Sequence, residues 1–423
     1  MATGDRIYVA DKETLDKVKQ DTTGILSFLQ DADGKFSNIK RYGVKINKAD
    51  SNPATRVTYL YDAVGLTPAK MNYTDGTFDF GDWGDKFFVA GNYPVMLNAD
   101  GTEAYKLNPN DYSLKADGTA SDITDESTTL NAMSAFPLMW LSQYEVGNYE
   151  YIIVADAPVD ASYQAEAFRR ADGTLAPKMY LPIFGGSYDG AKLRSLSGKT
   201  LMYNTNASTE VSRAAANGDI WTIIPWSRRN LINCLLIIMG KSDDTQTVFG
   251  QGQTSGYVDD ASQNYGHLPT GTLDSKGQFY GYSDTNHEVK VFHMEKWWGN
   301  RFDRLVGLIL DKGRYKVKLA PPYNLTGADF IDTGLSSPTG EGYQKDTYMT
   351  EWGRLPKAVG GASSTYLCDY FWVNTTIVAV ALVGGGCNDG AGCGASSVHL
   401  YRAAGFAYWH IGASLSCEQP SGA

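Results

Sequence analysis

Residues 382–417 read LVGGGCNDGAGCGASSVHLYRAAGFAYWHIGASLSC, and this stretch near the C-terminus decides the expected fold. Six glycines between positions 384 and 394 favour tight turns and close approach of the backbone. Aromatic, His and Arg side chains follow, and these residue types give large contact areas for few rotatable bonds. The stretch ends with an apolar spacing typical of a buried strand: Trp409, Ile411, Leu415 and Cys417.

The composition of this stretch is unusual. Between Gly384 and Gly412 there is no Lys, Glu, Gln or Met, although Lys and Glu are common elsewhere in the chain. An Asn codon that ends in C and is randomised at its adenines can encode Tyr, Phe, His, Cys, Asp, Arg, Ser or Gly, but never Lys, Glu, Gln, Met or Trp. Eleven residues fit this rule, and we expect them to be variable ligand-binding residues: Cys387, Asp389, Cys393, Ser396, Ser397, His399, Tyr401, Arg402, Phe406, Tyr408 and His410.

Two motifs carry a resemblance to a known family. The pattern GGG-x-N-x-G, followed by A-x-W-x-IGASLSC, resembles the C-terminal variable repeat of proteins that are diversified by retroelements. Residues 289–307 (VKVFHMEKWWGNRFDRLVG) resemble the F-x-x-E-x-x-W-G-N-x-W pattern of the same proteins, with Phe302 where that pattern often has Trp. The family includes phage tropism determinants, which bind receptors at virion tips. A Gly-rich and aromatic-rich end of some other β protein is the alternative interpretation.

The resemblance implies an α+β fold, a C-type-lectin-like body of the formylglycine-generating-enzyme type with a β-rich N-terminal region. We expect this body over residues 131–423, with its variable region at 384–412 and a β-rich region at 39–130. The implied function is host recognition by a phage tail protein, through a bacterial cell-surface receptor that is a protein or a glycan. The alternatives are a structural decoration protein of the virion and an oxidase of the formylglycine-generating type.

The five cysteines favour neither a disulfide scaffold nor a metal cluster. They form no C-x-x-C pair, and their odd number leaves at least one free thiol. The resembled oxidases use two cysteines near the C-terminus, but here five residues separate Cys387 from Cys393, one more than in the enzyme pattern. We therefore expect no enzyme activity and no cofactor.

The charge balance argues against nucleic acid as a partner. The chain has 47 acidic and 37 basic residues and a net charge of −10, whereas phosphate contacts require clustered Lys and Arg. No apolar run of about 18 residues occurs, so no membrane insertion is expected. No signal peptide is visible at the N-terminus, which fits a virion protein made in the host cytoplasm.

Residues 1–38 are expected to be an attachment or oligomerisation segment. Asp11 is a plausible N-cap of a short helix, and the segment is too short to bury a core alone. We expect it to contact other virion proteins or to form a homo-oligomer, most simply a trimer. Plain packing on the main body is the alternative.

Local patterns predict the remaining elements. Four Ala-Asp-Gly sequences, at 32–34, 99–101, 116–118 and 171–173, predict type I′ hairpin turns, and residues 146–148 (Val-Gly-Asn) predict another hairpin. The segments YGVKI, RVTYLYDAVG, KFFVAGNYPVML and EYIIVA are typical of strands. Residues 227–239 predict a buried helix with Ser227 as its N-cap.

Two further motifs predict no separate chemistry. Ser197-Gly198-Lys199-Thr200 lacks the first glycine of a phosphate-binding loop, because Leu193 stands there. The residues His287, His293 and Glu295 are the only group that resembles a metal or acid–base cluster. Metal sites need three or four ligands at fixed spacing, so a structural role is expected and no metal site is predicted.

Overall fold

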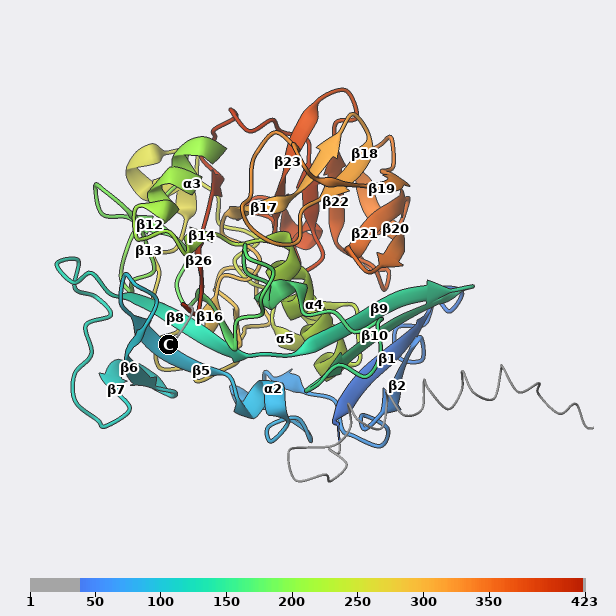
Figure 1. Ribbon diagram of the computed structural model, residues 1–423, viewed down its shortest axis with the longest axis horizontal. Helices are drawn as coiled ribbons and strands as arrows, with labels where there is room; N and C mark the ends of the chain where they lie inside the picture. Colours follow the sequence, from blue (N-terminus) through green and yellow to red (C-terminus); the bar gives the residue numbers. More distant parts are fainter. Residues whose placement is uncertain (1–38, 421–423) are drawn as a thin grey trace, which may run out of the picture.

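The computed structural model describes residues 39–420, and the predicted N-terminal segment at 1–38 lies outside this range. Strands predominate in the described chain, and one long helix lies near its centre (Figure 1). The expected α+β fold is therefore confirmed in coarse form only, as a mostly β protein with a few helices.

A four-stranded antiparallel sheet begins the described chain. Its order is β2 (Val57–Tyr61), β1 (Arg41–Asn47), β10 (Tyr149–Ala155) and β9 (Trp140–Val146). Tyr42, Val44 and Ile46 of β1 are buried, as alternation along a half-covered strand requires. The predicted hairpin at 146–148 is confirmed, because it joins β9 to β10.

A seven-stranded sheet holds the C-terminal end of the described chain. In order, its strands are β14 (Trp221–Ile223), β26 (Leu415–Glu418), β11 (Lys178–Pro182), β8 (Asn131–Pro137), β5 (Tyr93–Leu97), β6 (Glu103–Asn108) and β7 (Asp111–Lys115). Strands from 39–130 therefore pair with strands from 131–423, both here and in the four-stranded sheet. The two regions share sheets rather than forming separate ones.

A nine-stranded sheet carries the C-terminal stretch. Its path runs through β19 (Ile331–Ser336), β18 (Arg314–Val317), β17 (Phe302–Asp311), β23 (Val378–Val383), β24 (Val398–Leu400), β22 (Tyr370–Val373), β20 (Gly342–Thr350) and β21 (Gly353–Val359). The short strand β25 (Ile411–Gly412) pairs with β17 in parallel. Three two-stranded ribbons complete the sheets: β3 (Lys70–Asn72) with β4 (Thr77–Asp79), β12 (Ser187–Tyr188) with β13 (Leu193–Arg194), and β15 (Lys290–Val291) with β16 (Met294–Glu295).

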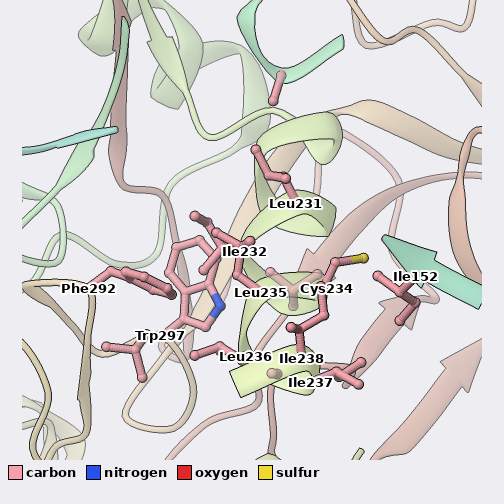
Figure 2. Packing of buried hydrophobic residues seen from close by; sticks show 14 of the residues in the cluster. Ile152, Leu231, Ile232, Cys234, Leu235, Leu236, Ile237, Ile238, Phe292 and Trp297 are labelled. Atoms are coloured by element: carbon pink, nitrogen blue, oxygen red, sulfur yellow. The ribbon is translucent and has the colours of Figure 1, made fainter. Parts of the chain in front are cut away.

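Helix α4 (Trp226–Gly240) is the centre of the core. Leu231, Leu235 and Ile238 share one face of the helix and Ile232 lies on another, and all four are buried against surrounding elements (Figure 2). The predicted helix is confirmed, but Ser227 is not its N-cap. Pro225 is the N-cap residue, and the Ser227 hydroxyl donates to the carbonyl oxygen of Leu319 instead.

The other helices are short. They are α2 (Phe87–Ala90), α3 (Ala207–Ala215), α5 (Thr245–Phe249) and the 3₁₀ turns η1 (Glu166–Phe168), η2 (Ala261–Gly266) and η3 (Gly390–Gly392). The expected strand over KFFVAGNYPVML is wrong in its first half, because Phe87–Ala90 form α2 and only Tyr93–Leu97 form β5. A short apolar run does not distinguish a buried helix turn from a strand.

The Ala-Asp-Gly sequences at 99–101, 116–118 and 171–173 are hairpin turns, but the predicted turn type is wrong. A type I′ turn needs positive φ at both central residues, and here only the glycines have it. In the first turn, Gly101 N–H donates to Asn98 O, and Asn98 N–H donates to Thr102 O. This is a type I turn followed by a left-handed glycine, with the Asp100 carboxylate accepting from the Thr102 N–H.

Candidate binding face

Residues 384–412 lie along the central strands of the nine-stranded sheet. They leave β23 at Val383, pass through η3 and β24, and return through β25. Strand β24 lies between β22 and β23, so His399 is opposite both Trp372 and Leu382. The loop after β24 runs past α3, where Ala207 N–H donates to Ala404 O (Figure 1).

The structure divides the eleven predicted site residues by exposure. Cys387, Cys393 and Ser397 are fully buried, and His399 is 7% exposed. Tyr408 is 47% exposed. The remaining six are half-buried: Asp389, Ser396, Tyr401, Arg402, Phe406 and His410.

The two cysteines of this region are free thiols inside the loop. The Cys393 thiol donates to Gly386 O at 3.3 Å, and the Cys387 thiol lies 3.7 Å from Tyr265 O. Burial raises the pKa of Cys387 to about 12 and the pKa of Cys393 well above its usual value. Both thiols are therefore protonated at neutral pH, whereas a reactive cysteine needs a lowered pKa and access to solvent.

Ring contacts join the exposed half of the stretch to residues far away in the sequence. Tyr408 meets His410 at a ring-centroid distance of 5.1 Å, and His410 meets Trp409 at 4.8 Å. Trp409 stacks on Tyr257 at 4.4 Å. On strand β24, the ring centroid of His399 lies 5.7 Å from that of Trp372 on β22.

The row of rings continues along β22 and onto β20. Tyr370 lies 4.6 Å from Trp372 and 5.1 Å from Tyr343, and all three are half-buried. A buried apolar cluster of Phe302, Leu382 and Ile411 lies beneath, with Trp372 and Phe406 packed on it. We call the combined surface the aromatic face; it comprises Tyr257, Tyr343, Tyr370, Trp372, His399, Tyr401, Arg402, Phe406, Tyr408 and His410.

Sequence reasoning missed Tyr257, Tyr343, Tyr370 and Trp372 as part of this surface. A signal was present in β22, because Tyr370 and Trp372 flank the buried Phe371 and so point to the same side of the strand. Which surface they join depends on the pairing of β22 with β24, which no local pattern reveals.

The aromatic face carries little charge. Burial lowers the pKa of His399 to about 3 and that of His410 to about 4, so both rings are neutral at pH 7. Arg402 is the cation: its guanidinium carbon lies 4.1 Å from the Phe406 ring centroid and 4.9 Å from that of Tyr401. Asp389 points elsewhere, because its carboxylate accepts from Gly386 N–H at 2.8 Å.

Scaffold side chains hold the stretch by its main chain. Asn233 donates to Ala395 O at 2.7 Å, and Arg229 donates to the same oxygen at 3.2 Å. The carboxylate of Asp369 accepts from Ser396 N–H at 2.6 Å. These bonds do not depend on which side chain position 396 carries, provided that the residue is not proline.

Side chains of the scaffold also contact main-chain carbonyl oxygens in the second half of the stretch. The guanidinium of Arg304 donates to Phe406 O at 2.9 Å. His267 Nε2 lies 3.0 Å from Trp409 O, and its Nδ1 lies 2.8 Å from the side-chain oxygen of Asn300.

The Trp-Trp-Gly-Asn motif at 297–300 supports this stretch from below. Asn300 donates from its side-chain amide to Leu268 O and to the Glu288 carboxylate, and its own carbonyl oxygen accepts from Cys387 N–H. Trp297 donates to Asn233. Asn300 thus links the loop at Leu268, the buried Glu288 and the start of the C-terminal stretch.

The group His287, His293 and Glu295 is not brought together as a site. His287 is exposed and bonds to Asp284, while His293 is buried against the Tyr112 hydroxyl at 2.7 Å. Glu295 accepts from two backbone N–H groups, those of Gly271 and Leu273. Within residues 39–420 no three His, Cys, Asp or Glu side chains are placed to hold a metal ion, and no helix is long and apolar enough to cross a membrane.

The fold and the site define a mostly β protein with an aromatic, nearly uncharged surface that is anchored through its backbone. No protein-family model matches the chain, and no curated protein matches its sequence. A solved structure similar to it is a "Major Tropism Determinant P3c Variant", with 12% identity and a TM-score of 0.29, covering 77% of this chain and 72% of that chain. At that score the likeness carries no conclusion about this chain.

Proposed function

We propose that this protein is a phage receptor-binding protein that attaches the virion to a bacterial cell through the aromatic face. The observation that carries the proposal is the group of aromatic contacts around residues 398–410, in which Tyr408 is exposed and Trp372 and His410 are half-buried. Aromatic and Arg side chains dominate the energetics of binding surfaces, and a functional surface on a rigid framework is a common arrangement. The two sequence motifs, which resemble those of retroelement-diversified proteins with a C-type-lectin-like fold, support the same function.

The anchoring of the stretch supports diversification of its side chains. Because Asn233, Asp369 and Arg304 bond to main-chain atoms, exchange of a neighbouring side chain leaves these bonds in place. We propose that variation acts on the partly exposed positions: Ser396, Tyr401, Arg402, Phe406, Tyr408 and His410. Cys387, Cys393, Ser397 and His399 then serve packing, and Asp389 shapes the turn.

We propose that each virion carries several copies of this protein and therefore binds a cell at several sites. Several copies on one virion raise the effective concentration of weak sites, and avidity can exceed single-site affinity by about a hundredfold or more. We propose a homo-oligomer, most simply a trimer, that contacts other virion proteins through residues 1–38.

The direct test is binding of the purified protein to a panel of intact bacterial cells. We expect Tyr408→Ala to weaken binding, because Tyr408 is the most exposed ring of the face. Tyr61→Ala is the matched control, since Tyr61 is 45% exposed on β2, at the lower right of Figure 1, away from α3 and the loop beside it. Equal binding by the two variants would contradict the proposal, and a wild-type protein that binds no cell would favour the decoration protein.

A second test concerns diversification alone. We expect a near-copy of the codons for residues 384–412 close to the gene, with differences only at adenines. Differences spread over all four bases would refute diversification and leave receptor binding by a fixed face.

A further inference from the structure

Arg402 is held in place by contacts with two aromatic rings. Its guanidinium carbon lies 4.1 Å from the ring centroid of Phe406 and 4.9 Å from that of Tyr401. Its own carbonyl oxygen accepts from Val380 N–H, which fixes the backbone at this position. A guanidinium that stacks on two rings loses little further freedom when it binds a ligand.

The Arg402 guanidinium has no ion-pair or hydrogen-bond partner within residues 39–420. No carboxylate oxygen lies within 4.0 Å of it, and it donates no hydrogen bond to the protein in this part of the chain. The nearby Arg304 differs, because Glu210 pairs with it at 2.5 Å. Five N–H donors of Arg402 are therefore open to a partner from outside.

The surroundings of Arg402 favour an anion. The two histidines beside it are neutral, and the positive charge of Arg402 contributes to the lowering of both their pKa values. No Lys, Asp or Glu lies between positions 390 and 412. The face therefore presents one positive charge among uncharged rings on a protein whose net charge is −10.

The extent and composition of the face favour a protein as the partner. Protein interfaces are enriched in aromatic residues and Arg and depleted in Lys and Glu at their centre, which is the composition found here. The face also holds two groups of ring contacts, one around Tyr370 and one around Tyr408, and a partner that engages both is larger than one sugar ring. A carboxylate is the group that matches the planar fork of a guanidinium with two parallel hydrogen bonds.

We propose that Arg402 recognises a carboxylate of an acidic side chain on a protein receptor, while the surrounding rings cover apolar surface next to that group. This inference rests on the proposed receptor-binding function. Arg402 thus determines specificity: it selects receptors that place an anion opposite its guanidinium.

The test uses cells that the wild-type protein binds. We expect Arg402→Gln to bind them about tenfold more weakly or worse, because a buried charge-assisted pair loses one partner. Arg402→Lys keeps the charge without the fork, so we expect partial loss. The matched control is Arg41→Gln, which removes an equal charge that also lies over a tyrosine ring, at 4.3 Å from Tyr61.

Treatment of the cells separates the sources of the anion. Amidation of surface carboxylates with a carbodiimide and glycinamide should reduce wild-type binding to the level of Arg402→Gln and leave binding of that variant unchanged. Protease treatment should abolish binding and periodate should not; the reverse result would overturn the protein assignment in favour of an acidic glycan. Unfolding curves confirm that the variants are folded.

The two proposals fail in different ways. If the wild-type protein binds cells and Arg402→Gln binds them equally well, the role of Arg402 is refuted and receptor binding stands. If the wild-type protein binds no cell, the proposed function is refuted, and the role of Arg402 with it.

Discussion

Replacement of Gly394 by Ala tests the geometry that holds the binding stretch. Gly394 has φ of +143°, and a Cβ atom added there would lie 2.2 Å from Asp369 Oδ1. No side chain fits at that distance, so the Asp369 carboxylate must move away from the Ser396 N–H that it now accepts at 2.6 Å. Asp369 is only 2% exposed, so its displaced carboxylate cannot turn to solvent for another donor.

The expected cost has two parts. A residue forced into a glycine-only conformation costs about 1–3 kcal/mol. A buried donor or acceptor left without its partner costs about 1–3 kcal/mol more. At an unfolding entropy of about 2.1 cal/mol/K per residue, a loss of about 4 kcal/mol lowers the Tm of a cooperative unit of this length by about 4–5 °C.

The assay is thermal unfolding of the purified variants, followed by circular dichroism. Gly405→Ala is the control in the same stretch, because a Cβ atom at that exposed position has no neighbour within 4 Å. We expect this control to melt within about 1 °C of the wild type, as most surface changes do. If Gly394→Ala melts together with Gly405→Ala, then the contact with Asp369 does not constrain the stretch and the reasoning is wrong.

Three further outcomes follow from buried groups. Arg304→Met should destabilise the protein by about 3–5 kcal/mol in a denaturant titration, because it leaves the Glu210 carboxylate buried and unpaired. The control is Arg314→Met, which removes an exposed ion pair with Asp332 and should cost less than about 1 kcal/mol. The Tm should fall as the pH drops from about 6.5 towards 4, because His399 and His410 have a lowered pKa in the folded protein and take up protons more readily in the unfolded chain. His399→Gln should make this fall in Tm with pH less steep, and an unchanged slope would contradict the role of His399. The five cysteines, all buried and free, should react with an aromatic disulfide reagent only slowly in the native protein and fully after denaturation; rapid native reaction of two thiols would revive the oxidase alternative.

Local chemistry predicted several elements of the fold. The apolar pattern of residues 227–239 was sufficient to predict helix α4, and Gly147 was sufficient to predict the β9–β10 hairpin. The same kind of pattern failed at Phe87–Ala90, where an apolar run too short to show a period forms α2. The sequence also did not predict that strands before position 130 pair with strands after it, because this pairing is set by packing between distant segments.

The candidate site was predictable in its position but not in its exposure. The codon pattern identified which residues of the stretch are candidates for variation, yet it contains no information on which side chains point inward. Burial of His399 follows from the place of β24 between β22 and β23, whose sequences lie outside the pattern. Tyr257, Tyr343 and Trp372 join the aromatic face for the same reason, through long-range pairing and ring contacts.

The bonds from scaffold side chains to the main chain of 384–412 have a consequence for evolution and for protein engineering. Most substitutions in a protein reduce its stability, and only those that keep it above a threshold survive. At the partly exposed positions of this stretch most substitutions should keep the protein above that threshold, because Asn233, Asp369 and Arg304 bind main-chain atoms, of which a proline would remove only the N–H of position 396. Large libraries of sequences at these positions should therefore remain folded, and selection among them can act on recognition alone.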